Sequence, residues 1–431
     1  MRVLVLGGYG LIGLECVRAL HLAGYSVVAL ARNRSRGERL FPHVSWVQGD
    51  LAKLQTTREW HPYIQNIDCV VNAAGVLQSG LRADPAAVQG DSIEALIGAI
   101  GSTSIRFVQI SAPGVNRQSS TGFYRSKFRA DKALQTSSVD WVILRPGVVF
   151  SQNAFGGSQM LRMIAAFPGV QPLINADARI QMVGLKDLVD AILVSVSGKI
   201  PSKTDVAICE QNSRSLLEIV SMIRSWLGYT PARVQFELPA FAGFVISKIA
   251  DGLGYLGWRS PLRTTATRIL KEGVTADPGP WAEISGLVPR SFDRVLLEQS
   301  ATLQERWFAR LSLMLPLVIA TLSLFFVMSG IIGFISFREA LKVLESTPLA
   351  DQLKTVFVAG GCVLDIGLGL MIVVRPWART AAIGMSLLGI IYLSAGTVLT
   401  PDLWLHPLGV FVKIMPAVIL PLIAFVLLEE R

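Results

Sequence analysis

The segment "MRVLVLGGYGLIG", residues 1–13, decides the fold of the first half of the chain. A short apolar run ends at a glycine, and the glycines after it satisfy both G-x-x-G-x-x-G and G-x-G-x-x-G spacing. Such a bend between a strand and a helix lets backbone amides at the helix N-terminus approach a pyrophosphate, so we expect a dinucleotide site. The residues expected at this site are Gly7, Gly8, Gly10, Leu11, Ile12 and Gly13.

The apolar runs that follow have the length and spacing of parallel strands. They lie at residues 26–32, 44–50, 67–75, 105–112 and 140–147. Helix-length stretches separate them, beginning with "LIGLECVRALHLAG", which predicts a helix that ends at Gly24. Short apolar runs that alternate with helices indicate a parallel sheet covered on both faces. We therefore predict an α/β fold, a doubly wound parallel-sheet Rossmann domain over residues 1–150.

Between residues 151 and 300 the pattern is less regular. The stretch "ARIQMVGLKDLVDAILVSV" predicts a strand that leads into a helix, and "LLEIVSMIRSWLG" predicts an amphipathic helix that ends at Gly228. We expect these residues to form a smaller, substrate-side lobe of the same unit, because ligands of such sheets bind beside the carboxyl ends of the strands.

Beyond Arg310 the chain consists of long apolar segments. Four are expected to span a membrane, at about residues 311–335, 355–374, 380–399 and 408–428. About 20 apolar residues at roughly 1.5 Å rise per residue cross the hydrocarbon core of a bilayer. We therefore predict an all-α four-helix transmembrane domain over residues 301–431, which accounts for a charged fraction of only 16%.

The distribution of charge bears on partners and orientation. The net charge is +9, but no run of Lys and Arg marks a nucleic-acid track. The lipid bilayer is therefore the expected partner, and no nucleic acid is expected. The first apolar stretch is too short for a signal-peptide core, so we expect the N-terminal domain in the cytoplasm. Basic residues beside the spans agree with this orientation; they are Arg306, Arg310, Arg375 and Arg379.

The segment "ARNRSR" follows the second expected strand, where a site for NAD usually offers an acidic residue to the ribose. A guanidinium binds a 2′-phosphate through charge-assisted hydrogen bonds, whereas a carboxylate would repel it. Arg32, Asn33 and Arg34 thus favour NADP(H) over NAD(H). The Cys and His residues are scattered, with no C-x-x-C pair, so no metal site is expected.

Two ionisable residues, Asp365 and Lys413, lie inside the expected spans. A charge at that depth requires a partner or a water-filled cavity. We expect either an Asp365–Lys413 ion pair, or a protonated Asp365 with Lys413 reaching the membrane surface, or a proton or quinone path. Tyr392, Ser394 and Thr397, all in the third expected span, are expected to hydrogen-bond between helices.

Several motifs together resemble the atypical or extended short-chain dehydrogenase/reductases over roughly residues 1–300. They are the glycine bend, "GDL" at 49–51, "NAAG" at 72–75, "ISA" at 110–112, Lys127 with Ala130 and Asp131, and "LRPG" at 144–147. The resemblance implies cofactor contacts along the groove between adenine and nicotinamide. The residues so implied are Asp50 and Leu51 at the adenine, Ala73, Ala74 and Gly75 in the groove, Lys127 at the ribose, and Pro146 and Gly147 near the nicotinamide.

The membrane part resembles the DoxX-like four-helix domain in helix count and general character. Together the two parts resemble bacterial membrane-anchored fusion proteins. This resemblance implies a multi-pass protein of the bacterial inner (cytoplasmic) membrane, with its N-terminal domain and C-terminus in the cytoplasm.

The same resemblance makes Ser111, Tyr124 and Lys127 the candidate catalytic residues. In the related enzymes the Tyr hydroxyl passes a proton to the substrate, and Lys lowers the Tyr pKa. Here Phe123, not Tyr124, lies four residues before Lys127. Three readings stay open: Tyr124 is a displaced proton donor, Ser111 and Lys127 serve only cofactor binding, or hydride transfer proceeds without the tyrosine.

Two classes of function follow. As an enzyme, the chain would be an NAD(P)-dependent oxidoreductase acting on a lipophilic substrate such as a quinone or isoprenoid, or a sugar-nucleotide epimerase/reductase-like enzyme. As a non-enzyme, it would be a nucleotide-binding accessory or assembly subunit of a membrane complex, such as a respiratory complex.

Overall fold

A computed structural model describes residues 1–78, 80, 84–101, 103–258, 260, 262–407 and 409–429. The chain divides into two compact units. The first comprises Met1–Gly254 and Ser260–Arg306, and the second comprises Tyr255–Arg259 and Trp307–Arg431.

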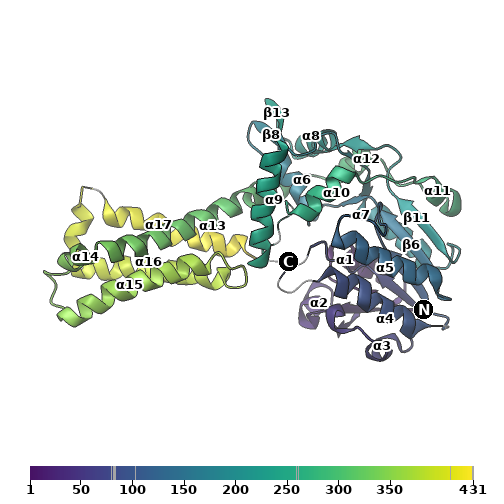
Figure 1. The fold of residues 1–431 in the computed structure, drawn as a ribbon, viewed down its shortest axis with the longest axis horizontal. Coiled ribbons are helices and arrows are strands. Elements are labelled where there is room, and N and C mark those ends of the chain that lie inside the picture. Colours follow the sequence, from purple (N-terminus) through teal and green to yellow (C-terminus); the bar gives the residue numbers. More distant parts are fainter. Residues whose placement is uncertain are drawn as a thin grey trace. The chain divides into compact units, whose positions relative to one another are not determined.

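The first unit is built on a seven-stranded parallel sheet (Figure 1) with the order β11-β6-β5-β4-β1-β2-β3. The strands are β1 (Arg2–Leu6), β2 (Ser26–Ala31), β3 (Ser45–Gln48), β4 (Cys69–Asn72), β5 (Arg106–Ile110), β6 (Asp140–Pro146) and β11 (Thr204–Ile208). Six of them coincide with apolar runs in the sequence, so the predicted doubly wound sheet is confirmed. The seventh, β11, comes from the residues beyond 150.

Helices cover both faces of the sheet. Alternate residues of β1 pack into two different cores, one on each face. Val3 and Val5 pack into one core with helices α1 (Leu11–Leu22) and α7 (Leu185–Val196). Leu4 and Leu6 pack into the other core, whose helices are α3 (Thr57–Ile64), α4 (Ser92–Ile100) and α5 (Gly122–Thr136). Because successive side chains of a strand point to opposite faces, an uninterrupted apolar run requires two cores.

The rest of the first unit consists of short strand pairs and helices. The pairs are β7 (Val148–Phe150) with β10 (Met182–Gly184), β8 (Val170–Leu173) with β13 (Val234–Glu237), and β9 (Arg179–Ile180) with β12 (Arg214–Ser215). The helices are α2 (Arg34–Leu40), α6 (Gly157–Ala165), α8 (Leu216–Trp226), α9 (Ala240–Tyr255), α10 (Thr264–Glu272), α11 (Gly279–Ser285) and α12 (Phe292–Leu297). Short helical turns are η1 (Leu51–Lys53) and η2 (Ala87–Asp91). The predicted strand-to-helix passage is β10 followed by α7.

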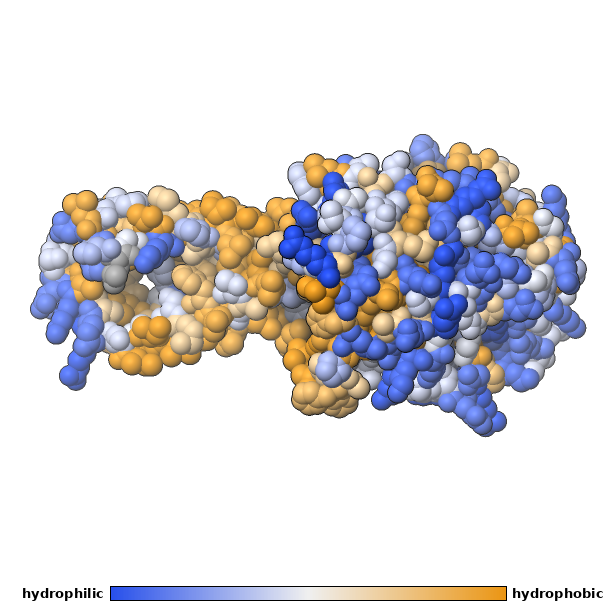
Figure 2. Space-filling model, turned by 90° about the horizontal axis from the view of Figure 1, so that it is seen from above, coloured by the Kyte–Doolittle hydropathy of each residue, from blue (hydrophilic) through white to orange (hydrophobic). Residues whose placement is uncertain are grey.

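The second unit is helical, and four of its helices are long and apolar enough to cross a membrane. They are α13 (Leu303–Ile335), α15 (Asp351–Met371), α16 (Ala378–Leu399) and α17 (Val410–Leu427), joined by α14 (Phe337–Val343) and η3 (Pro401–Leu405). Figure 2 shows apolar side chains exposed along this unit. The four expected spans are confirmed as helices, although Leu408, where the last was expected to begin, lies outside the described residues.

The buried Asp365 is held by hydroxyl groups from two other spans. Ser329 Oγ on α13 donates to its carboxylate at 2.7 Å, and Tyr392 Oη on α16 donates at 3.2 Å. The expected ion pair with Lys413 is wrong: the described residues contain no such pair, and Lys413 is exposed near the start of α17. The two hydroxyl donors take the place of the ammonium group. The expectation of a bond between helices is confirmed for Tyr392, whereas the Thr397 hydroxyl donates to the Leu393 carbonyl of its own helix at 2.6 Å.

Candidate functional site

The glycine bend has the geometry of a cradle for a diphosphate. Gly7 has a φ of +73°, and the Gly10 amide donates to the Gly7 carbonyl at 2.8 Å. A Cβ added at Gly13 would lie 2.1 Å from the Gly7 oxygen. In the described chain, Gly10 precedes α1 without a side-chain cap, which leaves the first amides of the helix free for a ligand. These residues fit the phosphates of a dinucleotide.

The bend lies where the strand order of the sheet reverses. β1 is bonded to β4 on one side and to β2 on the other, and ligands of open α/β sheets bind at such a point. The loop after β4 approaches the bend closely, because a Cβ on Gly7 would lie 3.0 Å from Ala74 Cα. The Ala74 amide is oriented by Asn72 Oδ1 at 3.2 Å. Ala73, Ala74 and Gly75 therefore lie at the crevice.

The basic segment at the end of β2 presents exposed guanidinium groups. Arg32 is exposed, and Arg34 Nε pairs with Glu38 at 2.7 Å on the surface of α2. Asn33 Oδ1 accepts from the Arg36 amide at 3.0 Å and thereby caps α2. The Arg36 guanidinium lies 5.6 Å from the centre of the Tyr9 ring, within the glycine bend. The segment thus places positive charge beside the cradle.

Further along the crevice, the other residues implied by the resemblance occupy strand ends. Asp50 follows β3 and caps η1 by accepting from the Ala52 amide at 3.2 Å, and Leu51 is buried. Pro146 ends β6, and Gly147 permits a close crossing, because a Cβ there would lie 2.4 Å from the Gln181 oxygen.

Ser111 points into a buried polar network. Its hydroxyl donates to Asp131 Oδ2 at 2.5 Å and accepts from Arg145 Nη1 at 3.2 Å. Arg145 also pairs with Asp131 at 3.0 Å and with Asp205 at 2.6 Å. Burial raises the pKa of Asp131, while Arg145 and Ser111 oppose this shift. The Ser111 hydroxyl therefore links β5, α5 and β6.

Lys127 is likewise directed at a protein group. Its Nζ donates to the Ile110 carbonyl at 2.7 Å and lies 5.8 Å from the centre of the Phe123 ring. Burial lowers the pKa of Lys127 to about 8, and the Arg145 charge adds to this shift while Asp131 opposes it. Phe123 thus occupies the neighbouring position where the related enzymes have their tyrosine.

Tyr124 is buried in the first turn of α5. This helix starts regularly at Gly122, and the Thr121 hydroxyl caps it by accepting from the Tyr124 amide at 3.3 Å. The Tyr124 hydroxyl packs near Gly114, 3.8 Å from the position of an added Cβ. Burial raises the pKa of Tyr124 to about 12, and the negative charge of Glu272 contributes to this shift. A displaced proton donor would need an irregular start of the helix to turn the phenol toward Lys127, but the described α5 begins with a regular, capped turn.

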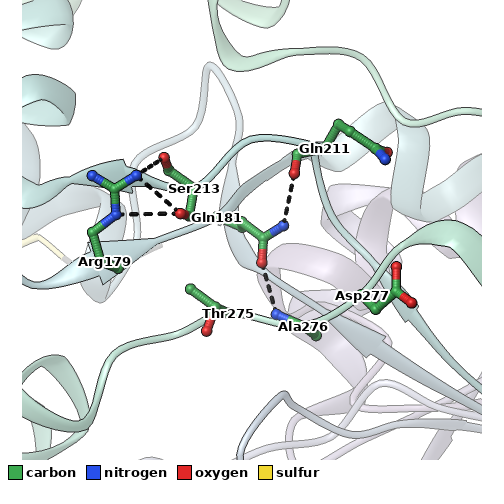
Figure 3. Close-up of a pocket in the computed structure, with 7 residues that line it drawn as sticks. All are labelled: Arg179, Gln181, Gln211, Ser213, Thr275, Ala276 and Asp277. Atoms are coloured by element: carbon green, nitrogen blue, oxygen red, sulfur yellow. Dashed lines mark hydrogen bonds between the residues drawn. The ribbon is translucent and has the colours of Figure 1, made fainter.

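A shallow surface cavity of about 460 Å³, open to solvent, lies in the substrate-side residues (Figure 3). The Gln181 side chain joins two of the lining segments: its amide group donates to the Glu210 carbonyl at 2.8 Å and accepts from the Ala276 backbone amide at 2.7 Å. Arg179 hydrogen-bonds with Ser213. The lining is mostly polar and consists of Arg179, Gln181, Gln211, Ser213, Thr275, Ala276 and Asp277. Sequence reasoning missed this cavity, since its residues come from three separate segments (179–181, 211–213 and 275–277) without a motif.

The described residues contain no group of three or more His, Cys, Asp or Glu that could hold a metal ion. Asp131 and Arg145, to which the sequence analysis assigned no role, carry the network around Ser111. Arg145 is the one charged residue in the apolar run "WVILRPG", and this position was the signal that could have indicated a buried polar partner.

Two protein families match separate parts of the chain. Residues 7–164 match the NAD(P)H-binding family, and residues 323–422 match the DoxX-like family. The chain thus has an NAD(P)-binding domain at its N-terminal end and a DoxX-like domain at its C-terminal end. No curated protein matches it.

Solved structures similar to the chain belong to the short-chain dehydrogenase-like Rossmann fold. WbmH of Bordetella bronchiseptica in complex with NAD+ has a TM-score of 0.52 at 16% identity, over 71% of this chain and 98% of that one. MoeE5 in complex with UDP-glucuronic acid and NAD has a TM-score of 0.51 at 18% identity, over 70% and 98%. UDP-glucose 4-epimerase of Thermotoga maritima with UDP-glucose has a TM-score of 0.50 at 14% identity, over 69% and 96%. At these identities the likeness establishes the fold.

Proposed function

We propose that this chain, an NAD(P)-binding domain joined to a DoxX-like membrane domain, is an oxidoreductase that uses NADP(H) on a lipophilic substrate such as a quinone or isoprenoid. The observation that carries the proposal is the glycine cradle between β1 and α1, where a Cβ at Gly13 would lie 2.1 Å from the Gly7 oxygen. The cradle holds the diphosphate, and the exposed Arg32 binds the 2′-phosphate. When bound, the cofactor supplies a hydride.

The proton that accompanies this hydride comes from solvent in our proposal. Ser111 and Lys127 hydrogen-bond to Asp131 and to the Ile110 carbonyl, so neither is directed at the Tyr124 phenol. The pKa of Tyr124 is raised to about 12, whereas the related enzymes lower the pKa of their tyrosine. Ser111 and Lys127 therefore act as positioning residues that fix the ends of β5 and α5 beside the cofactor.

We place the protein in the bacterial inner membrane with the first unit in the cytoplasm. The α13 N-terminus, the connection between α15 and α16, and the α17 C-terminus lie on one side of the bilayer, because four spans alternate in direction. Arg310 and Arg379 on this side favour a cytoplasmic surface by the positive-inside rule, and the connection without Lys or Arg between α16 and α17 agrees. The connection between α13 and α15 does not agree, since it carries Arg338 and Lys342.

The polar cavity favours a second candidate, a sugar-nucleotide epimerase/reductase-like activity. Its amide, hydroxyl and guanidinium groups suit a hydroxylated ligand better than an apolar one. Two of the similar structures hold a UDP-linked sugar or sugar acid.

A turnover assay separates these functions. The purified full chain, in lipid nanodiscs, is supplied with NADPH and either a short-chain quinone or a UDP-sugar. We expect NADPH oxidation with the quinone. Conversion of the UDP-sugar alone would establish the second candidate, and tight NADPH binding without any turnover would identify an accessory subunit and overturn both.

A further inference from the structure

The two faces of helix α9 differ from those of an ordinary surface helix. The residues that face its own unit are small; they are Gly243, Ser247, Ala250 and Gly254. The opposite face carries large apolar side chains: Phe241, Phe244, Val245, Ile249 and Leu253, with exposures of 76%, 60%, 37%, 60% and 36%. A helix of a soluble protein normally buries its large apolar residues and exposes polar ones.

The small residues explain how α9 is fixed in this orientation. A Cβ added at Gly243 would lie 3.3 Å from Ile174, and one added at Gly254 would lie 2.6 Å from the Arg263 Cζ. Asp251 accepts hydrogen bonds from Arg263 at 3.2 Å and from the Thr264 amide at 3.3 Å. Close packing on this side therefore prevents the helix from rotating its apolar face inward.

The residues directly after α9 contact the connection between two candidate membrane spans, α15 and α16. The Leu256 carbonyl accepts from the Arg375 amide at 2.9 Å, and Trp258 Nε1 donates to the Val373 carbonyl at 2.6 Å. The Arg375 guanidinium lies 5.6 Å from the Trp258 ring. Val373 and Arg375 belong to the connection between spans α15 and α16, so this contact lies where the chain leaves the bilayer.

Aromatic residues mark the same surface. Trp307, at the start of the first span, and Trp377, just before α16, are each 58% exposed. Trp side chains favour the boundary between headgroups and acyl chains. The C-terminal end of α9 thus leads directly, at Leu256, into a boundary with the features of a membrane interface.

We infer that α9 is a membrane-surface helix whose exposed apolar face lies in the interfacial layer of the lipid bilayer. Phe241, Phe244 and Ile249 insert toward the acyl chains, as the apolar face of an interfacial helix does. Lys248, on the same side, lies with its Nζ 5.5 Å from the Phe244 ring and extends to the headgroups.

Spin labels on the full chain in nanodiscs test this assignment. Single cysteines replace Phe244, Ile249 or, as a control, Leu22 on α1, which is 83% exposed. The native cysteines are buried, so the label reacts with the new one. We expect the ratio of accessibility to oxygen over accessibility to a water-soluble nickel chelate to be at least roughly threefold higher at 244 and 249 than at 22.

Two results would overturn the inference. A nickel accessibility at 244 and 249 equal to that at 22 would mean that the face is open to water. Low accessibility to both reagents would mean that protein covers it, for instance a second copy of the chain. The measurement uses no dinucleotide, so its outcome is independent of the proposed cofactor and activity.

Discussion

Two regions lie at the carboxyl ends of strands: the glycine bend after β1 and the cluster around Ser111 after β5. They differ in whether their polar groups are hydrogen-bonded within the protein. In the described residues, the bend leaves the first amides of α1 without a side-chain cap. The cluster instead joins Ser111, Asp131 and Arg145 to one another within 3.2 Å. Free donors are what a ligand requires, whereas mutually bonded groups stabilise the fold. The first region should therefore determine binding and the second stability.

The largest effect is expected from closing the cradle. Gly13→Ala puts a Cβ 2.1 Å from the Gly7 oxygen, so α1 must move away from the bend. We expect the affinity for NADPH to fall by at least about 100-fold, because the helix amides lose their position. Isothermal titration calorimetry measures this. The control is Gly157→Ala, where an added Cβ meets no described atom within 4 Å. Unchanged affinity for NADPH in Gly13→Ala would show that the glycine bend does not bind the diphosphate.

A smaller, selective effect is expected at the basic segment. Arg32→Ala should weaken NADPH by about 10- to 50-fold and NADH by no more than about twofold, because only NADPH carries the 2′-phosphate. Arg39→Ala, at an exposed position of α2, should change neither affinity. Equal losses for both dinucleotides would contradict the assignment of the phosphate to Arg32.

Lys127 provides a pH test in the second region. Its folded pKa of about 8 lies below the unfolded value of about 10.4, so the folded state holds fewer protons between these values. Stability should therefore rise between pH 8 and about 10, by on the order of 2 kcal/mol, and Lys127→Met should flatten the rise. Thermal unfolding followed by tryptophan fluorescence measures it. Parallel curves for the two proteins would show that Lys127 is charged and solvated.

Ser111→Ala should separate stability from binding. Loss of the 2.5 Å hydrogen bond to the buried Asp131 is expected to cost about 1–2 kcal/mol of unfolding free energy. NADPH affinity should stay within about threefold, unlike in Gly13→Ala. Ser104→Ala, at an exposed position before β5, is the control. A large loss of affinity with unchanged stability would mean that the hydroxyl serves the ligand.

The smallest effect is expected for Tyr124→Phe. A phenol with a pKa raised to about 12 is a poor proton donor, so binding and turnover should remain within about twofold of the parent protein. A fall in kcat of about 100-fold, with KM unchanged, would instead identify Tyr124 as a displaced proton donor.

Continuous apolar runs predicted the sheet and the spans because burial in a parallel sheet or in lipid requires them along the whole element. β11 was not predicted, since "TDVAI" is short and the exposed Asp205 interrupts it. The Asp365–Lys413 pair failed for another reason: which groups meet inside a bundle depends on how each helix is rotated. Similarly, the sequence placed Tyr124 beside Lys127, but the Thr121 cap sets the start of α5 and with it the direction of the phenol.

A calorimetric titration of the purified full chain with NADPH and with NADH measures whether the glycine bend after β1 binds a dinucleotide. We expect saturable one-site binding with a clear preference for NADPH, together with a rise in Tm. The absence of both heat and a thermal shift with either dinucleotide would contradict it.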